Sequence, residues 1–221
     1  MTDSQARLAP TTVRVPVVLL RPLAVTLVIG FALAATWLYL QSQSAEPITP
    51  PASALIGDGT GLEVAFELVD HRGQPVTIAS YQGAPLLVVF GYTSCPDVCP
   101  MTLARLASAL EGLESDGMLA QGVFITVDPI RDTPEVLASY VAAFHERLSG
   151  LTGDDRGLRQ ATQSFRVFYE KVGEGDDDYF MDHSAYIYLL GPGGDLLSYY
   201  HPDLDSEALL TDIRKRLSRR M

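Results

Sequence analysis

The sequence predicts an α/β fold of alternating strands and helices, preceded by a single transmembrane helix. Three observations lead to this prediction. Residues 23–40 are uncharged over a length that suits a membrane span. Beyond them, short apolar runs alternate with stretches in which leucines recur at helical spacing. The only two cysteines, Cys95 and Cys99, stand four residues apart directly after one of these apolar runs. A lone pair of this kind is typical of a redox or metal site where a strand leads into a helix.

The N-terminal apolar stretch, LAVTLVIGFALAATWLYL at 23–40, is predicted to be a membrane anchor. At about 1.5 Å per residue, such a stretch nearly crosses a hydrocarbon core of about 30 Å. Arg7, Arg14 and Arg21 precede it, whereas the next basic residue is Arg72. The positive-inside rule therefore leaves 1–22 as a short cytoplasmic N-terminus and exports the rest of the chain.

The fate of this stretch leaves an alternative. Ser42-Gln43-Ser44 is a small-x-small sequence at which a signal peptide could be cleaved. The apolar region of a signal peptide usually runs about 7–15 residues, which is shorter than the stretch here. We therefore expect an uncleaved, single-pass inner-membrane protein. Its C-terminal domain would lie in the periplasm, or in the intermembrane space of a mitochondrion.

Residues 41–60 are predicted to be a linker, because small, polar and proline residues there show no hydrophobic period. The folded domain is therefore placed at 61–221. From residue 45 onward the chain has 26 acidic and 13 basic residues, a net charge of −13. This excess of acid argues against nucleic acid as a partner and favours solubility.

The elements of the domain follow from local patterns. The run PLLVVFG at 85–91 is apolar on both faces, as expected for a central strand covered by helices. Thr133 and Pro134 supply an N-cap and a first helical residue. The predicted elements are an N-terminal β-hairpin over 65–70 and 75–79, a strand over 85–91, a helix ending near Gly117, a strand over 122–127, a helix over 134–148, a helix over 155–164, a strand over 166–172, a hairpin of 185–190 and 196–200, and a helix over 205–217. With a cysteine pair after the first buried strand, this order is the thioredoxin-like arrangement.

Two prolines shape the cysteine loop. Pro96 follows Cys95 and Pro100 follows Cys99, and a residue before proline avoids the α region. We therefore expect a non-helical loop with Cys99 at the N-cap of the next helix, where the helix dipole would stabilise its thiolate. Asp97 would oppose this effect unless its carboxylate caps the helix. The loop alone is compatible with a disulfide, with thiol–disulfide exchange and with a soft metal ion.

Three stretches of the domain form a larger pattern: GYTSCPDVCP at 91–100, VDPIRDTPE at 127–135 and DHSAYIYL at 182–189. In order and spacing, and with an N-terminal anchor, the chain from about residue 62 onward resembles the Sco/SenC family of thioredoxin-like copper proteins. This resemblance implies one copper ion bound by Cys95, Cys99 and His183. It also implies a role in assembling the binuclear copper site of cytochrome c oxidase.

The residue types agree with this implied ligand set. Two thiolates and an imidazole suit Cu(I) and can also hold Cu(II), whereas zinc is the main competitor for the same atoms. His183 is expected at the beginning of a strand, directly before the 185–190 segment, and it follows an acid-rich segment, 173–178, that is expected to be mobile. A ligand on a mobile segment would let copper be taken up and released. Without the family pattern, a strand-edge histidine paired with Asp182 would be the simpler interpretation.

Two functions remain open. A metallochaperone would bind one copper ion and pass it to the copper-site subunit of cytochrome c oxidase. A thiol–disulfide oxidoreductase would instead reduce the cysteines of that subunit, and His183 would then be dispensable. Because an oxidised cysteine pair cannot bind copper as thiolates, we also expect a thioredoxin-like reductant outside the cytoplasm as a partner.

Other polar residues have structural interpretations. Capping and a local ion pair are expected for Asp128, Arg131 and Asp132, with docking of a partner as the alternative. Met181 is expected to pack rather than to supply a thioether ligand. The remaining histidines are expected to be structural or exposed, and these are His71, His145 and His201.

Overall fold

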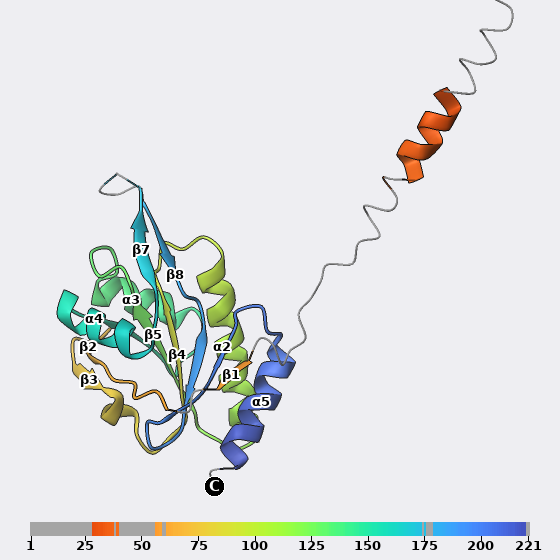
Figure 1. Ribbon diagram of the computed structural model, residues 1–221. Coiled ribbons are helices and arrows are strands. Elements are labelled where there is room, and N and C mark those ends of the chain that lie inside the picture. Colours follow the sequence, from red (N-terminus) through yellow and green to blue (C-terminus); the bar gives the residue numbers. More distant parts are fainter. Residues whose placement is uncertain are drawn as a thin grey trace, which may run out of the picture. The chain divides into compact units, whose positions relative to one another are not determined.

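The computed structural model describes residues 28–37, 39, 56–58, 61–173, 175 and 179–219 (Figure 1). The chain divides into two compact units, Met1–Thr49 and Pro50–Met221. In the first unit, residues 28–37 are helical and their side chains are exposed. The rest of the predicted anchor, apart from residue 39, lies outside the described residues, as does the predicted cytoplasmic segment 1–22. Within the described part of the chain, no helix is both long and apolar enough to cross a membrane.

The second unit is built on a mixed sheet of eight strands in the order β1-β10-β9-β4-β5-β6-β2-β3. Strands β4, β5 and β6 are parallel, and the other pairs are antiparallel. The strands are β1 (Ile56–Asp58), β2 (Glu67–Asp70), β3 (Pro75–Thr77), β4 (Leu86–Gly91), β5 (Gln121–Thr126), β6 (Leu148–Thr152), β9 (Ile187–Leu190) and β10 (Leu196–Tyr200).

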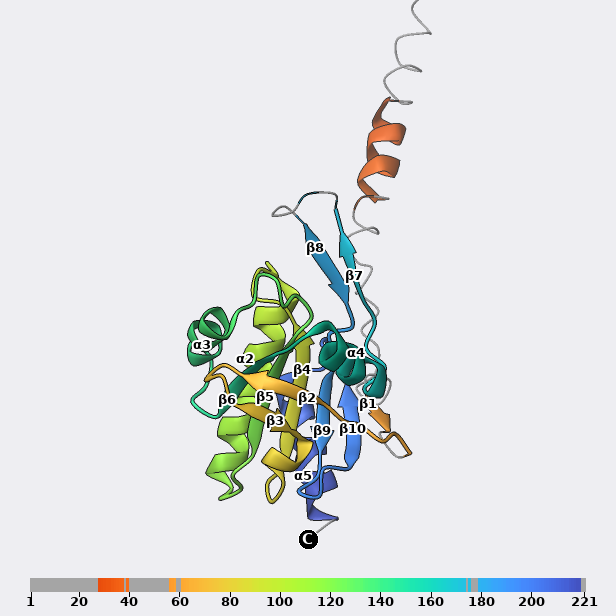
Figure 2. The same ribbon diagram turned by 90° about the vertical axis from the view of Figure 1, so that its left-hand side faces the viewer.

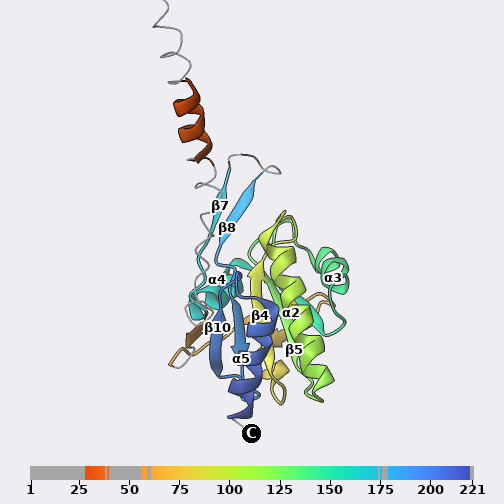
Figure 3. The same ribbon diagram turned by 90° about the vertical axis from the view of Figure 1, so that its right-hand side faces the viewer.

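Helices cover both faces of this sheet, so its central strands are apolar throughout. Side chains alternate along β4: Leu87 and Val89 enter one core, and Leu86, Val88 and Phe90 enter the other. The first core includes residues of α2 (Val98–Ser115), α3 (Pro134–Ala142) and α5 (Ser206–Ser218). The second includes residues of α4 (Asp155–Ser164) and of the short 3₁₀ helix η2 (Ile78–Tyr81). Figure 2 shows α4 in front of the sheet, and Figure 3 shows α2 and α5 in front of the opposite face.

A second sheet has only two strands, β7 (Tyr169–Val172) and β8 (Phe180–His183). The two strands are antiparallel, and Tyr169 is paired with His183. This β7–β8 hairpin projects beyond the end of the large sheet (Figures 1 and 2). Most of the segment predicted to be mobile, 173–178, lies outside the described residues.

The α/β prediction and the N-terminal hairpin, β2–β3, are confirmed, but several boundaries are wrong. The helix predicted over 134–148 ends at Ala142, and a strand that was not predicted, β6, follows it. The sequence of β6, LSGLT, has neither a continuous apolar run nor a strict alternation, so no local pattern marks it as a strand, and its pairing with β5 makes it one. The strand predicted over 166–172 begins at Tyr169 and belongs to the small sheet. Strand β1 lies within the segment predicted to be a linker.

Candidate metal centre

The cysteine pair lies between β4, which ends at Gly91, and α2, which begins at Val98. Asp97 is the N-cap residue, without a side-chain capping hydrogen bond, and Cys99 lies inside the first turn. The prediction of Cys99 at the N-cap and of Pro100 at the first helical position is therefore wrong by two residues. Proline is tolerated this early because the first N–H groups of a helix have no intrahelical partner.

Three side chains that could hold a metal ion converge at this junction. The Sγ atoms of Cys95 and Cys99 and a ring nitrogen of His183 all lie within 4.8 Å of one another. Cys99 Sγ is 3.2 Å from His183 Nε2, and the Cys99 N–H donates to Cys95 Sγ at 3.4 Å. Both cysteines are free thiols. The structure thus brings together all three residues selected from the sequence.

His183 lies at the end of β8 and reaches the cysteines from there. The prediction that it begins the next strand, which corresponds to β9, is wrong. Its Nδ1 lies 3.2 Å from the Ser184 carbonyl oxygen, which can only accept a hydrogen bond. Nδ1 therefore carries the proton, and the lone pair of Nε2 faces Cys99. Burial lowers the pKa of His183, against the opposing effects of Ser184 and Asp182, so the imidazole is kept neutral. A neutral imidazole is the form that binds a metal.

Cys99 is fully buried, with 1% of its surface exposed, whereas Cys95 is partly exposed. Burial raises the pKa of the Cys99 thiol, with smaller contributions from Cys95 and Asp132. The expected stabilisation of its thiolate at a helix N-terminus is therefore wrong, because desolvation is the largest effect on this pKa and outweighs the lowering effect of the Tyr92 backbone hydrogen bond. Close packing with Gly91 explains part of this burial: a Cβ at that glycine would lie 2.8 Å from Cys99 Sγ.

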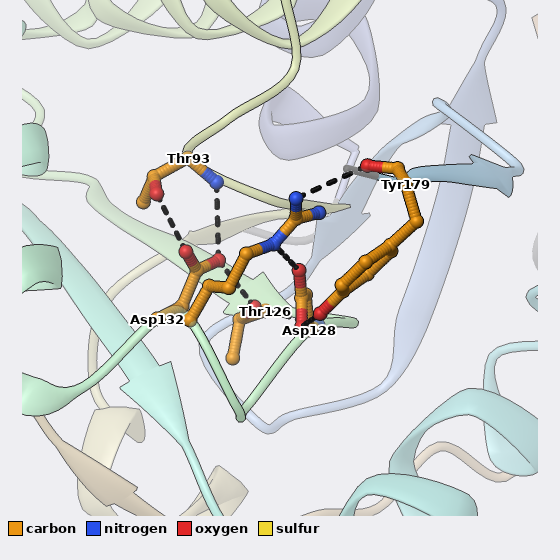
Figure 4. Close-up of polar contacts among 6 residues, drawn as sticks. Thr93, Thr126, Asp128, Asp132 and Tyr179 are labelled. Carbon is orange, nitrogen blue, oxygen red and sulfur yellow. Dashed lines mark hydrogen bonds and ion pairs between the residues drawn. The ribbon is translucent and has the colours of Figure 1, made fainter. Parts of the chain in front are cut away.

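A buried carboxylate braces the start of the cysteine loop. Asp132 is completely buried and accepts hydrogen bonds from the Thr93 N–H at 3.0 Å and the Thr93 hydroxyl at 2.5 Å (Figure 4). The Thr126 hydroxyl, at the end of β5, donates to the same carboxylate at 2.6 Å. Thr133 is the N-cap residue of α3, as predicted, and accepts the capping hydrogen bond from the Val136 N–H, so Asp132 does not take the capping role that was also considered for it. Asp132 therefore ties the loop of β4 to the end of β5.

The expected ion pair between Asp128 and Arg131 is present, with Arg131 Nε 2.5 Å from Asp128 Oδ2. A third residue, Tyr179, joins this pair by donating its hydroxyl to Asp128 Oδ1 at 2.7 Å. Tyr179 was not singled out in the sequence. Its partner Asp128 is 51 residues away in the sequence, and no local spacing connects the two residues. The one sequence signal that could have identified Tyr179 is its position three residues before the 182–189 stretch.

The other candidate residues do not join the three ligands. Each of the remaining histidines accepts a backbone N–H at Nδ1: His71 from Gly150, His145 from Arg147 and His201 from Asp203. Met181 lines the cleft next to Cys95 and His183, but its side chain packs against the second core. These outcomes agree with the structural interpretations made from the sequence.

The donor set fits a copper ion. Metal–ligand bonds of about 2.0–2.3 Å place two donors on one ion within about 4.6 Å of each other, so the observed separations require only small side-chain movements. Two sulfurs and one imidazole nitrogen form the soft donor set that Cu(I) prefers. The cleft that holds them opens between the cysteine loop and β8. The site is thus accessible to an incoming ion from one side.

Comparisons with known proteins agree with this site. The SCO1/SenC family model matches residues 57–218. The mitochondrial SCO2 homolog of Homo sapiens is 38% identical over 204 residues, which cover 89% of this chain and 75% of the human protein.

Two solved structures extend the comparison to the fold. Arabidopsis thaliana ScoI with copper bound is 36% identical, with a TM-score of 0.69, and is matched over 72% of this chain and 99% of its own. Bradyrhizobium japonicum ScoI with copper bound is 38% identical, with a TM-score of 0.64, over 71% and 100% of the two chains. These matches confirm the α/β, thioredoxin-like fold. The chain therefore belongs to the SCO1/SenC family.

Proposed function

We propose that this protein is a membrane-anchored copper metallochaperone. It binds one copper ion through Cys95, Cys99 and His183 and delivers it to the binuclear copper site of cytochrome c oxidase. The observation that carries this proposal is the convergence of the three donor atoms within 4.8 Å. Two solved relatives that are named as having copper bound, from A. thaliana and B. japonicum, support copper as the ion. The role in oxidase assembly follows from membership of the SCO1/SenC family.

The three ligands would have different roles, with two that hold the ion and one that passes it on. Cys99 is buried and His183 presents a neutral Nε2, so both are fixed in place before the metal arrives. The raised pKa of Cys99 means that its thiol gives up a proton as copper binds. Cys95 is partly exposed and lines the open cleft. Its sulfur is therefore the ligand that an acceptor's cysteine reaches first in a ligand exchange.

The same asymmetry supports a second candidate, the thiol–disulfide oxidoreductase. The partly exposed Cys95 would attack a disulfide in the oxidase subunit, and the buried Cys99 would then resolve the mixed disulfide. In this exchange the disulfide of the target is reduced to two thiols, and Cys95 and Cys99 are oxidised to a disulfide. His183 has no part in this exchange. The two candidates therefore differ in their requirement for the imidazole.

The setting of the domain is part of the proposal. The uncharged stretch at 23–40 would anchor the protein in the inner membrane, with 1–22 in the cytoplasm and 61–221 in the periplasm or the intermembrane space. That compartment favours disulfides, and a Cys95–Cys99 disulfide could not supply two thiolates to copper. A thioredoxin-like reductant outside the cytoplasm would keep the pair reduced.

The metal site is tested by copper titration of the reduced protein, followed by spectroscopy. We expect one copper ion per chain in the wild type, and loss of this stoichiometric binding in Cys95→Ala, Cys99→Ala and His183→Ala. A His201→Ala variant serves as the matched control, since it removes an imidazole that contacts none of the three ligands. Stoichiometric binding by all three ligand variants, or full copper occupancy of the air-oxidised wild type, would rule out the dithiolate–imidazole site.

Oxidase assembly in cells that carry His183→Ala separates the two functions. Delivery of copper predicts that assembly is lost although the variant still exchanges thiols and disulfides in a purified assay. Normal assembly in this variant would be evidence for reduction of the oxidase cysteines in place of copper delivery.

A further inference from the structure

The β7–β8 hairpin carries His183 on the face that points to the rest of the domain. Side chains alternate along a strand, so Tyr179, Met181 and His183 share one face of this segment and Phe180 and Asp182 share the other. Burial follows the same alternation: Tyr179 is 4% exposed, whereas Phe180 is 58% exposed. The inward face thus has His183 at one end and Tyr179 at the other.

His183 contacts the domain at the base of the hairpin. Its Nε2 faces Cys99 Sγ, and its ring packs edge-on against Tyr92 with the ring centroids 5.8 Å apart. At about 3.3 Å per residue, Tyr179 lies about 13 Å further along the strand. A two-stranded sheet that is held only at its base has little to prevent it from tilting. A second point of attachment on this strand therefore controls where the imidazole lies.

Asp128 and Arg131 provide that attachment through a clamp on Tyr179 (Figure 4). The Tyr179 hydroxyl donates to Asp128 Oδ1 at 2.7 Å, and Arg131 Nη1 donates to the Tyr179 carbonyl oxygen at 3.0 Å. The Arg131 guanidinium also lies 3.7 Å from the centroid of the Tyr179 ring. Asp128 is 3% exposed, so the clamp lies in a region of low dielectric, where hydrogen bonds to a charged group are strong.

The same short loop holds the other half of the metal site. Asp132 accepts two hydrogen bonds from Thr93, which stands two residues before Cys95. The Asp132 N–H in turn donates to the Asp128 carbonyl oxygen at 3.0 Å, so the two ends of the loop are joined. The Arg131 guanidinium also lies 5.7 Å from the centroid of Tyr92, the ring that packs against His183. Residues 128–132 therefore contact both the dithiol loop and the strand that carries the imidazole.

We propose that loop 128–132 sets the separation between the dithiol and the imidazole, with Asp128, Arg131 and Tyr179 as positioning residues for His183. Among the described residues, these positioning residues form no hydrogen bond with Cys95, Cys99 or His183. They act by fixing the tilt of the β7–β8 hairpin. This inference rests on the proposed copper site, because only a bound ion requires the three donors to be held at bonding distance.

The test compares Tyr179→Phe with Tyr169→Phe in the full-length protein. Tyr179→Phe keeps the ring over Arg131 and removes only the hydroxyl that donates to Asp128. Tyr169→Phe is the matched control, because it removes a hydroxyl from the paired strand β7 that has no hydrogen-bond partner among the described residues. Hydrogen exchange of the metal-free protein and pulsed EPR of the Cu(II) form, which detects coupling to imidazole nitrogen, are the two measurements.

Without metal, we expect backbone amides of 180–183 to exchange about tenfold faster in Tyr179→Phe, with the amides of β4 and β5 unchanged. With Cu(II), we expect a weakened imidazole coupling, a retained thiolate-to-copper absorption band and a dissociation rate that is about tenfold higher. Arg131→Lys, which cannot both stack and donate as the guanidinium does, should change the same signals in the same direction. Tyr169→Phe should match the wild type in both measurements.

The outcomes separate the two proposals. Unchanged exchange and unchanged imidazole coupling in both Tyr179→Phe and Arg131→Lys would overturn the positioning role while leaving the copper site intact. Equal loss of the thiolate band and the imidazole coupling would also overturn it, since that result indicates general destabilisation. Absence of imidazole coupling in the wild type would instead contradict the proposed copper site itself.

Discussion

At the scale of single residues, burial controls the chemistry of the proposed metal centre. Cys99, Asp128 and Asp132 are all less than 4% exposed, and each is polar or ionisable. Burial raises the pKa of Cys99 and of Asp132, because the charged form of each is poorly solvated. For Asp132, the hydrogen bonds from Thr126 and Thr93 oppose this shift without cancelling it. The buried carboxyl group of Asp132 thus holds Thr93, at the start of the loop that carries the two cysteines.

The stability of the protein should depend on pH through Asp132. Its pKa is raised above the ordinary value of 3.8, so the folded protein keeps this proton to a higher pH than the unfolded chain does. The contribution of Asp132 is then fully present below 3.8 and is lost as the pH rises through the folded-state pKa. We expect Asp132→Asn to be less stable by about 1–3 kcal/mol, since three hydrogen bonds are disturbed. This deficit should be larger at pH 4 than at pH 7.

Urea denaturation of both proteins at the two pH values measures this difference, and effects of other groups that titrate equally in both cancel. A deficit that grows from pH 4 to pH 7 would show that the hydrogen bonds outweigh burial in setting the pKa of this carboxyl group.

At the scale of elements, the site forms where the carboxyl ends of two adjacent parallel strands meet. Strand β4 leads into the cysteine loop and β5 leads into loop 128–132, and Gly91 is paired with Thr126 at their ends. In open α/β sheets, ligands bind at this edge. The third ligand arrives on β8, which is not part of the large sheet. The metal centre therefore joins a rigid sheet edge to a projecting hairpin.

Helix α3 packs closely on β6, the strand that was not predicted from the sequence, and Gly150 of β6 lies at this contact. A Cβ at Gly150 would lie 2.8 Å from Leu137 Cβ and 3.3 Å from Val141 Cγ1. A Cβ atom cannot rotate away, so α3 would have to move. We expect Gly150→Ala to lower the free energy of unfolding by about 1–3 kcal/mol, as overpacking of a core does. Copper stoichiometry should remain unchanged, since none of Gly150, Leu137 and Val141 lines the proposed metal centre.

Thermal or chemical unfolding measures this loss, with Gly193→Ala as the control. The Cβ of that variant would meet only the Asp195 carboxylate, at an ordinary contact distance of 3.4 Å. Equal stability of Gly150→Ala and the wild type would mean that α3 does not pack this closely on β6.

At the scale of the whole molecule, the proposed metal centre belongs entirely to one of the two units. Its three ligands, the two buried cores and the eight-stranded sheet all lie in Pro50–Met221. This unit is strongly acidic by its own composition, since the chain from residue 45 onward has 26 acidic and 13 basic residues. Folding and copper binding are therefore expected to be independent of the N-terminal segment.

Removal of residues 1–49 tests both this independence and the proposed anchor. We expect the shortened protein to bind one copper ion with an unchanged unfolding midpoint, because the described core begins at Phe66. We also expect it to move from the membrane fraction to the soluble fraction, since the uncharged stretch is gone. Cell fractionation, calorimetry and copper titration measure these outcomes. A shortened protein that still sediments with membranes would contradict an anchor at 23–40.

The sequence by itself determined the parts of this protein that local patterns encode. The central strand at 85–91 and the cysteine pair after it could be recognised without a structure. So could the three stretches of the family pattern, from which Cys95, Cys99 and His183 were identified as candidate ligands. What only the tertiary structure decided depends on contacts between distant residues. The raised pKa of Cys99 follows from how deeply the core buries it, strand β6 from its pairing with β5, and the clamp on Tyr179 from a contact across 51 residues. No spacing along the chain encodes such contacts, because burial and long-range hydrogen bonds exist only after the elements have packed.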